Sequence, residues 1–194
     1  MSRSADPFFE TEAEAPVPPR RAVQVLLVVL IVATKLLVLA ALGHDAVCSC
    51  GTILLFQHAF DANGNSQQVS DWYSALHVLF GLGLFVFIDR MRPFWGLGQK
   101  AVVAIMGSAI WEVVENLPFT IALFHAPSGA VPYTGDSLLN SFTDTLFVAL
   151  GFFVAAKIPL WATILLGLAL ELAVTLAMDD GMIVGSLRIL GLDV

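Results

Sequence analysis

The stretch "TGDSLLNSFTDTLF", residues 134–147, begins as a polar turn and runs without a break into an apolar helix. Gly135 suits a turn, and Asp136 suits the N-cap of the helix that follows. Asn140 and Asp144 then lie one helical turn apart inside a segment that otherwise has the composition of a membrane span. An amide and a carboxylate are unfavourable in lipid, so the groups that they contact inside the protein decide how the helices pack.

The rest of the chain also has the composition of an integral membrane protein. Of its 194 residues, 58% are hydrophobic and 13% are charged, and the mean hydropathy is +0.84. A soluble domain has about 45–50% apolar and about 25% charged residues. The formal net charge of -7 provides no basic surface for nucleic acid. The lipid bilayer is therefore the expected partner, and nucleic acid is excluded.

Five apolar stretches have about the length of 20 residues that a helix needs to cross a bilayer. They cover about residues 22–43, 73–89, 101–120, 138–156 and 160–178. The predicted fold class is all-α: a polytopic membrane helix bundle of about five transmembrane helices, formed by residues 22–194. Pro118 is expected to end or kink the third span. The acidic and proline-rich residues 1–21 are predicted to be a disordered cytoplasmic tail.

The basic residues predict the orientation of the bundle. Those that flank the spans are Arg3, Arg20, Arg21, Arg90, Arg92, Lys100 and Lys157. All of them fall on one side of the membrane if the N-terminus is cytoplasmic, as the positive-inside rule requires. The segment after Asp179 is then outside the cytoplasm, and because it is too short to span, it is expected to lie along the membrane surface.

Each predicted span contributes at least one ionisable or polar side chain from within its apolar stretch. These side chains are Lys35, His77, Glu112, Glu115, Asn116, Asn140, Asp144 and Glu171. On the third span Glu112, Glu115 and Asn116 recur at helical spacing, which places them on one face, and the fourth span repeats the pattern. A polar face of this kind packs inward in a membrane protein. We therefore expect these side chains to share one layer inside the bundle.

Acids outnumber bases in this layer. A charged side chain at mid-membrane costs at least about 2.5–3.5 kcal/mol on insertion scales, so unpaired carboxylates are unfavourable. Lys35 and His77 are the cationic candidates in the layer. The carboxyl groups are therefore expected to be paired, to share a proton or to bind a cation, for which a divalent metal ion is the candidate.

The polar residues divide into three groups by the role that they are expected to have. The candidate metal ligands are His77, Glu112 and Asp144. The candidate catalytic residues are Glu112, Glu115, Asp144 and Glu171. Structural roles are expected for Lys35, Asn116, Asp136 and Asn140. Hydrogen bonding between helices is favoured for Asn140, and Glu115 equally fits a place at the headgroup level facing water. The spacing matches no standard zinc or nucleophile motif.

Two cysteines open the segment between the first two spans, in "CSCG", residues 48–51. Cys48 and Cys50 form a candidate thiol pair. An internal disulfide is disfavoured because residues two apart bridge only with strain. Pairing with another chain, metal binding and free thiols are the alternatives.

Taken in order, several motifs resemble those of an uncharacterised family of bacterial multi-pass inner-membrane proteins, a domain of unknown function. The motifs are "CSCG", "NSQQVSDWY", "WEVVEN" and "YTGDSLLNSFTD". The resemblance covers about residues 44–172 and implies a protein of the bacterial inner membrane, with no established reaction. Phe80 departs from the pattern, because the family commonly has a second histidine there. "HAPSGAVP" stands where basic residues usually precede "GDS".

Three functions are compatible with the predicted layer. The favoured hypothesis is a non-enzymatic membrane protein whose polar layer binds an ion or holds the bundle together, with a membrane protein or a second copy of the chain as partner. The second is a metal-dependent intramembrane hydrolase or transferase acting on a lipid-linked substrate, with Glu115 or Glu171 as general base. The third is a proton- or cation-coupled transporter.

Overall fold

The computed structural model describes residues 21–59, 61, 64–123 and 133–189. The regular elements of these residues are all helices. They are α1 (Arg21–Ala41), α2 (Ser74–Met91), α3 (Leu97–Glu115), α4 (Pro118–Leu123), α5 (Leu138–Ala155), α6 (Leu160–Met178) and α7 (Met182–Ile189). Five of them, α1, α2, α3, α5 and α6, are long and apolar enough to cross a membrane. The predicted fold class is confirmed, whereas residues 1–20 of the predicted tail lie outside the described residues.

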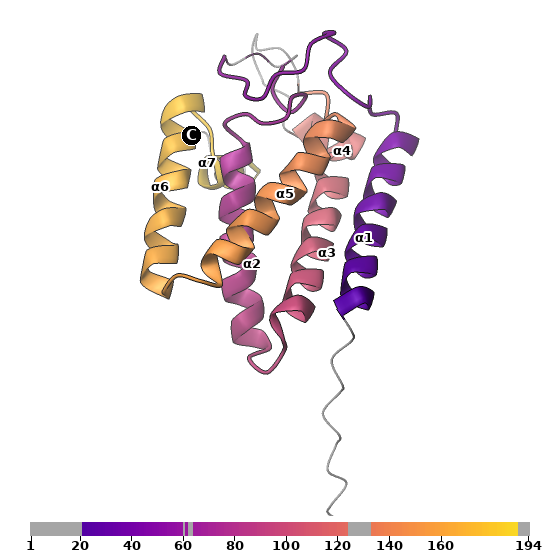
Figure 1. Ribbon diagram of the computed structural model, residues 1–194. Helices are drawn as coiled ribbons and strands as arrows, with labels where there is room; N and C mark the ends of the chain where they lie inside the picture. The colour runs from indigo at the N-terminus through magenta and orange to yellow at the C-terminus, as the bar shows by residue number, and fades with distance from the viewer. Residues whose placement is uncertain (1–20, 60, 62–63, 124–132, 190–194) are drawn as a thin grey trace, which may run out of the picture.

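The five long helices form one bundle with α2 near its centre (Figure 1). α5 crosses α2, α6 packs on one side of α2, and α3 and then α1 follow on the other side. The connections from α1 to α2 and from α3 to α5 lie at the same end of the bundle, and the short turn between α2 and α3 lies at the opposite end. Side chains from α2, α3 and α5 therefore meet in the interior.

The crossing of α2 and α5 depends on two glycines. A Cβ atom on Gly81 of α2 would collide with the backbone of Val148, and one on Gly151 of α5 would collide with the backbone of Val78. Each helix thus lies directly against the backbone of the other, which is the close approach that small residues permit in membrane helices. The faces of α2 and α5 that carry these glycines therefore pack against each other.

The third span begins and ends earlier than predicted. It was expected over residues 101–120, whereas α3 runs from Leu97 to Glu115. Asn116 is its C-cap, and Pro118 begins the separate helix α4. A proline cannot donate the backbone hydrogen bond that would continue α3, but it suits the first turn of a new helix.

The start of α5 differs by one residue from the prediction. Ser137, and not Asp136, is the N-cap: its backbone is extended and its hydroxyl accepts a hydrogen bond from the N–H of Asn140. The prediction for Asp136 was wrong because its carboxylate is engaged by Tyr133 and Asn116, which leaves the next residue to cap the helix. Gly135 makes the turn before the helix with a φ of +92°, a conformation that favours glycine.

The first half of α5 holds the polar segment that precedes α2. Backbone carbonyls of consecutive residues in that segment accept hydrogen bonds from α5 and its cap. The pairs are Ser137 N–H to Ser66 (3.0 Å), Ser137 Oγ to Gln67 (3.0 Å), Asn140 Nδ2 to Gln68 (3.1 Å) and Thr143 Oγ1 to Val69 (2.7 Å). Asn140 was expected to bond between helices. Its Nδ2 instead donates a hydrogen bond to a backbone carbonyl of the loop, because unpaired loop carbonyls need donors when they are buried.

The C-terminal part of the described chain turns back toward the bundle. α7 lies beside α6 (Figure 1), and the carboxylate of Glu171 accepts hydrogen bonds from the N–H groups of Met182 (3.2 Å) and Ile183 (2.8 Å). Glu171 lies well inside α6, so α7 begins beside that part of α6 and not beyond its end. The expected place of this segment along the membrane surface stays a prediction. Both oxygens of Glu171 are used in this cap.

Candidate metal centre

Three side chains from three helices converge inside the bundle. They are His77 of α2, Glu112 of α3 and Asp144 of α5, and each offers one ligand atom that lies within 4.8 Å of the other two. Nδ1 of His77 lies 3.4 Å from Oε1 of Glu112, and Nε2 lies 3.6 Å from Oδ2 of Asp144. The structure therefore brings together the three residues that the sequence offers as metal ligands. We call these three residues together the metal cluster; the term denotes the side chains themselves.

The two oxygens of Glu112 have different surroundings. The side chain is completely buried, with 0% of its surface exposed. Oε2 accepts a hydrogen bond of 2.6 Å from the hydroxyl of Ser141 and lies 3.8 Å from Nζ of Lys35. Oε1 faces His77 and has no hydrogen-bond partner among the residues that the structure describes. A buried acceptor without a donor is unfavourable, so Oε1 is an unused ligand atom that points into the metal cluster.

Lys35 holds α1 against this cluster. Its ammonium group is buried and donates hydrogen bonds to the carbonyl of Ser141 (2.5 Å) and to the hydroxyl of Thr145 (2.7 Å). It also lies close enough to Glu112 to balance one negative charge. Thr145 was not singled out in the sequence. Its position four residues after Ser141, on the same face of α5, is the signal that would have identified it.

Asp144 is held weakly by its neighbours. Its Oδ1 lies 3.5 Å from the hydroxyl of Ser74, at the outer limit of a hydrogen bond, and its Oδ2 faces His77. Both His77 contacts, at 3.4 and 3.6 Å, are longer than the usual 2.7–3.2 Å of an N–H···O bond. Two ligands of a tetrahedral metal with bonds of about 2.0–2.1 Å lie roughly 3.3 Å apart. The two contacts use different nitrogens of His77, and an imidazole gives one nitrogen to a given ion, so only one of them can correspond to two ligands of the same ion. One ligand atom from each of the three residues lies within 4.8 Å of the other two.

Asp136 lies outside the spans, between α4 and α5, and is bound tightly to Asn116. Nδ2 of Asn116 donates to Oδ2 of Asp136 (2.6 Å), and the backbone N–H of Asp136 donates to Oδ1 of Asn116 (2.6 Å). The hydroxyl of Tyr133 donates to the other carboxylate oxygen (2.8 Å). Burial, helped by the charge of Glu112, raises the pKa of Asp136 to about 6, although the bonds from Asn116 and Tyr133 oppose the shift. Asn116 and Asp136 thus join the end of α3 to the segment that leads into α5.

Two further acids surround the metal cluster. Glu115 lies one turn beyond Glu112 on α3, and its Oε2 is buried without a hydrogen-bond partner among the described residues. Asp71 precedes α2 and accepts hydrogen bonds from the backbone N–H groups of Ser66 (2.6 Å) and Tyr73 (2.8 Å). Burial raises the pKa of Asp71, and these bonds oppose the shift. The interior is therefore rich in carboxyl groups with few cations to balance them.

Glu171 and the two cysteines are not part of the metal cluster. The carboxylate of Glu171 caps α7, so the structure does not bring it to His77 and Asp144 as the expected common layer required. Cys48 and Cys50 are joined as a disulfide, the pairing that their spacing disfavours. Nε2 of Gln68 lies 3.4 Å from Sγ of Cys50 and connects this end of the loop to the segment held by α5.

The fold and the metal cluster define a class of protein: a polytopic helical membrane protein with a histidine and two carboxylates converging in its interior. The chain belongs to the family described as "Protein of unknown function (DUF2585)", whose model matches residues 39–191. The resemblance predicted from the sequence motifs is thereby confirmed at the level of the family.

Relatives in several bacteria carry the name UPF0314 protein. One from Agrobacterium fabrum is 36% identical over 141 residues, which cover 71% of this chain and 70% of the relative. One from Sphingopyxis alaskensis is 37% identical and covers 73% of this chain and 76% of the relative. One from Brucella anthropi is 32% identical and covers 92% of this chain and 91% of the relative. No solved structure gives a significant match to the chain.

Proposed function

We propose that this membrane protein binds a divalent metal ion inside its helix bundle, with His77, Glu112 and Asp144 as ligands. The observation that carries the proposal is the convergence of these three ligand atoms within 4.8 Å, with the fully buried Oε1 of Glu112 lacking any hydrogen bond among the described residues. An ion at this point would give that oxygen a partner and would join α2, α3 and α5.

The chemistry of the ligands supports a first-row divalent ion. One imidazole nitrogen and two carboxylate oxygens form a ligand set used for zinc, manganese and ferrous iron. Lys35 balances the charge of Glu112 on the side away from His77, and the described group in ion-pair contact with Asp144 is His77, which is charged only when it is protonated. Because uncompensated charge is costly inside a membrane, a bound cation stabilises this arrangement.

Two roles of the ion follow from different features. A structural role, in a non-enzymatic membrane protein, requires only that the ion crosslinks three helices, and we favour it. A catalytic role as a hydrolase or transferase on a lipid-linked substrate is favoured by one observation, the second buried and unpartnered carboxylate oxygen at Glu115. Three protein ligands leave a position for water, and a nearby carboxylate is suited to take a proton from it.

The location that we propose is the bacterial inner membrane, with the N-terminus in the cytoplasm. Arg90, Arg92 and Lys100 lie around the α2–α3 turn, at the end of the bundle where α1 begins. The positive-inside rule assigns that end to the cytoplasm. The disulfide between Cys48 and Cys50 then lies on the outer side, where an oxidising compartment preserves such bonds.

The test of the metal site is the metal content of the protein purified in detergent without chelator, measured by inductively coupled plasma mass spectrometry. We expect about one divalent ion per chain in the wild type and a loss of at least ten-fold in Glu112→Gln and Asp144→Asn. Glu171→Gln is the matched control. It also neutralises a buried carboxylate, but that carboxylate caps α7 and is not one of the proposed ligands. It should keep the ion. A wild type that carries no ion, also after incubation with zinc or manganese, contradicts the proposal.

The catalytic role is tested separately with Glu115→Gln. This variant should keep the ion whether the role of the ion is structural or catalytic. If the protein is an enzyme, metal-loaded wild type incubated with membrane lipid extracts should produce a new species by lipid mass spectrometry that Glu115→Gln does not produce. Identical lipid profiles with and without the wild-type protein favour the structural role.

A further inference from the structure

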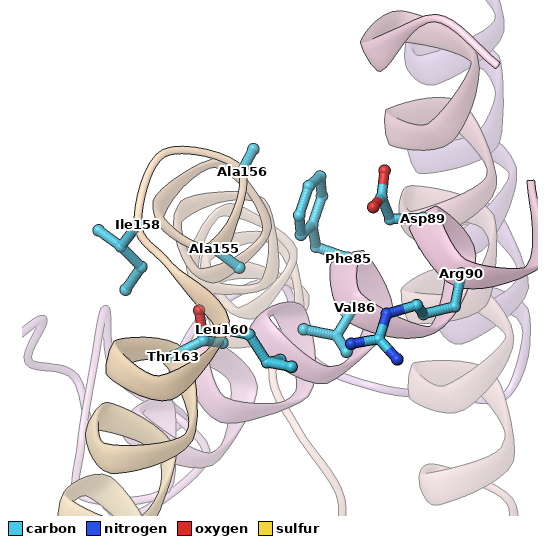
Figure 2. A pocket seen from close by; sticks show the side chains of 9 residues that line it. All are labelled: Phe85, Val86, Asp89, Arg90, Ala155, Ala156, Ile158, Leu160 and Thr163. Carbon is cyan, nitrogen blue, oxygen red and sulfur yellow. The ribbon is translucent and has the colours of Figure 1, made fainter. Parts of the chain in front are cut away.

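A second candidate site lies at the end of the bundle where α2 ends and α6 begins, opposite the end that carries the α1–α2 connection. A pocket of about 280 Å³ opens where α2 ends and the chain turns from α5 into α6 (Figure 2). Phe85, Val86 and Arg90 of α2 form one wall. Ile158 of the α5–α6 connection and Leu160, the first residue of α6, form the facing wall. The pocket contains none of the residues of the metal cluster, so it is independent of the proposed metal centre.

The pocket combines an apolar slot with one unpaired cation. Asp89 also lines it, but its carboxylate is paired with Lys100, at 2.5 Å. The side chain of Arg90 makes no hydrogen bond or ion pair with any residue that the structure describes. In Figure 2 its side chain extends along α2 over Val86 toward Leu160. The free charge in the pocket is therefore positive and lies beside apolar side chains.

The depth of the pocket is that of the membrane boundary. Arg90 is in the last turn of α2, and Lys157 lies in the turn that follows α5. Basic residues at span ends lie at the level of the lipid phosphates, where they attract anionic headgroups. The wall formed by Leu160 continues onto the apolar surface of α6, since the side chain of Leu160 is exposed.

We infer that this pocket binds an anionic phospholipid, with its phosphate on the guanidinium of Arg90 and one acyl chain between α2 and α6. A guanidinium matches a phosphate with two parallel hydrogen bonds. The slot supplies the apolar contact that a free phosphate ion could not use. The charge complementarity and the position at the membrane boundary together select a lipid as occupant.

The inference is tested by native mass spectrometry of the purified full chain in neutral detergent, titrated with phosphatidylglycerol or with phosphatidylcholine of the same chains. We expect one phosphatidylglycerol to bind about five- to ten-fold more tightly than phosphatidylcholine. Arg90→Gln should remove this preference. Arg92→Gln is the matched control, because Arg92 lies over the ring of Trp95, 5.4 Å from its centroid, and does not line the pocket. It should keep the preference.

A second variant tests the slot without changing charge. Val86→Trp fills the space between α2 and α6 while Arg90 stays in place, and it should weaken lipid binding several-fold without altering the metal content. Equal binding of both lipids, or equal effects of Arg90→Gln and Arg92→Gln, would overturn the inference in favour of diffuse surface charge. Inorganic phosphate that displaces the lipid completely at equal concentration would overturn it in favour of a plain anion site.

Discussion

At the scale of single residues, the proposed metal site depends on the asymmetry of Glu112. One oxygen is satisfied by Ser141 and Lys35, and the other faces His77 without a hydrogen bond. Lys35 thus balances the charge of Glu112 from the α1 side, and the oxygen on the other side, which faces His77, is the one that we propose as a metal ligand. The pair of Lys35 and Glu112 is completely enclosed, so each partner depends on the other for its stability in the membrane.

The first prediction concerns this buried pair. Lys35→Met should destabilise the protein by about 3–5 kcal/mol, because it leaves the Glu112 carboxylate unpaired. The double variant Lys35→Met with Glu112→Gln should recover part of that loss, because neither charge is then buried alone. Thermal melting in detergent with a chelator present measures the four proteins without a contribution from metal. Strictly additive effects would show that the two side chains do not interact.

The second prediction concerns pH and Asp136. Its pKa in the folded protein is about 6, above the value of about 3.9 for an unfolded chain, so the folded state binds the proton more tightly. The stabilisation by this proton is complete below about pH 4 and is lost as the pH rises through about 6. The melting temperature should fall between pH 5 and 7, and Asp136→Asn should reduce that fall. Asp45→Asn, at an exposed position, is the control that should melt like the wild type.

Helical spacing was enough to select His77, Glu112 and Asp144 as a group, because the position of a residue fixes the face of its helix that it occupies. The same reasoning placed Glu171 with them. Its carboxylate instead caps α7. Spacing gives the direction of a side chain on its own helix, but it gives no information on a later segment that folds back against that helix.

At the scale of helices, residues 134–147, which lead into α5, present two polar faces. One face holds the loop before α2 through Ser137, Asn140 and Thr143. The other face builds the interior through Ser141, Asp144 and Thr145. A polar helix inside a membrane protein is stable in this way because every polar side chain meets protein and not lipid. α5 therefore connects the segment before α2 directly to the metal cluster.

The third prediction concerns the crossing of α2 and α5. Gly81→Ala should destabilise the protein by about 1–3 kcal/mol, because the added methyl group meets the backbone of Val148 and forces the helices apart. Gly83→Ala is the matched control, since a Cβ there has no atom within 4 Å. It should change stability by no more than about 0.5 kcal/mol. Melting curves that are equal for the two variants would rule out the close helix contact.

Helix boundaries show what apolar stretches can and cannot predict. The five spans were located correctly because their length and hydropathy are sufficient signals. The end of α3 was placed too late because apolar residues continue through α4, and only Pro118 marks the break. The N-cap of α5 was misplaced by one residue because Asp136 and Ser137 are both good caps, and a tertiary contact with Asn116 decides between them.

At the scale of the whole molecule, the orientation in the membrane is the fourth prediction. Single cysteines at Ile53 and Phe94, both exposed, mark the two ends of the bundle in a background with Cys48 and Cys50 replaced by serine. A maleimide that does not cross membranes should label Ile53→Cys in intact spheroplasts and Phe94→Cys only after permeabilisation. The reverse pattern would place the N-terminus outside, in contradiction to the positive-inside rule.

The measurement that tests the central claim most directly is X-ray absorption spectroscopy at the metal edge of the purified protein. The proposed site predicts a first shell of nitrogen and oxygen only, at about 2.0–2.1 Å for zinc, with the outer-shell scattering of one imidazole. Asp144→Asn should lose this signal and Glu171→Gln should keep it. A shell containing sulfur at about 2.3 Å, which would assign the ion to Cys48 and Cys50, or the absence of an ordered metal from the wild type, would contradict the account.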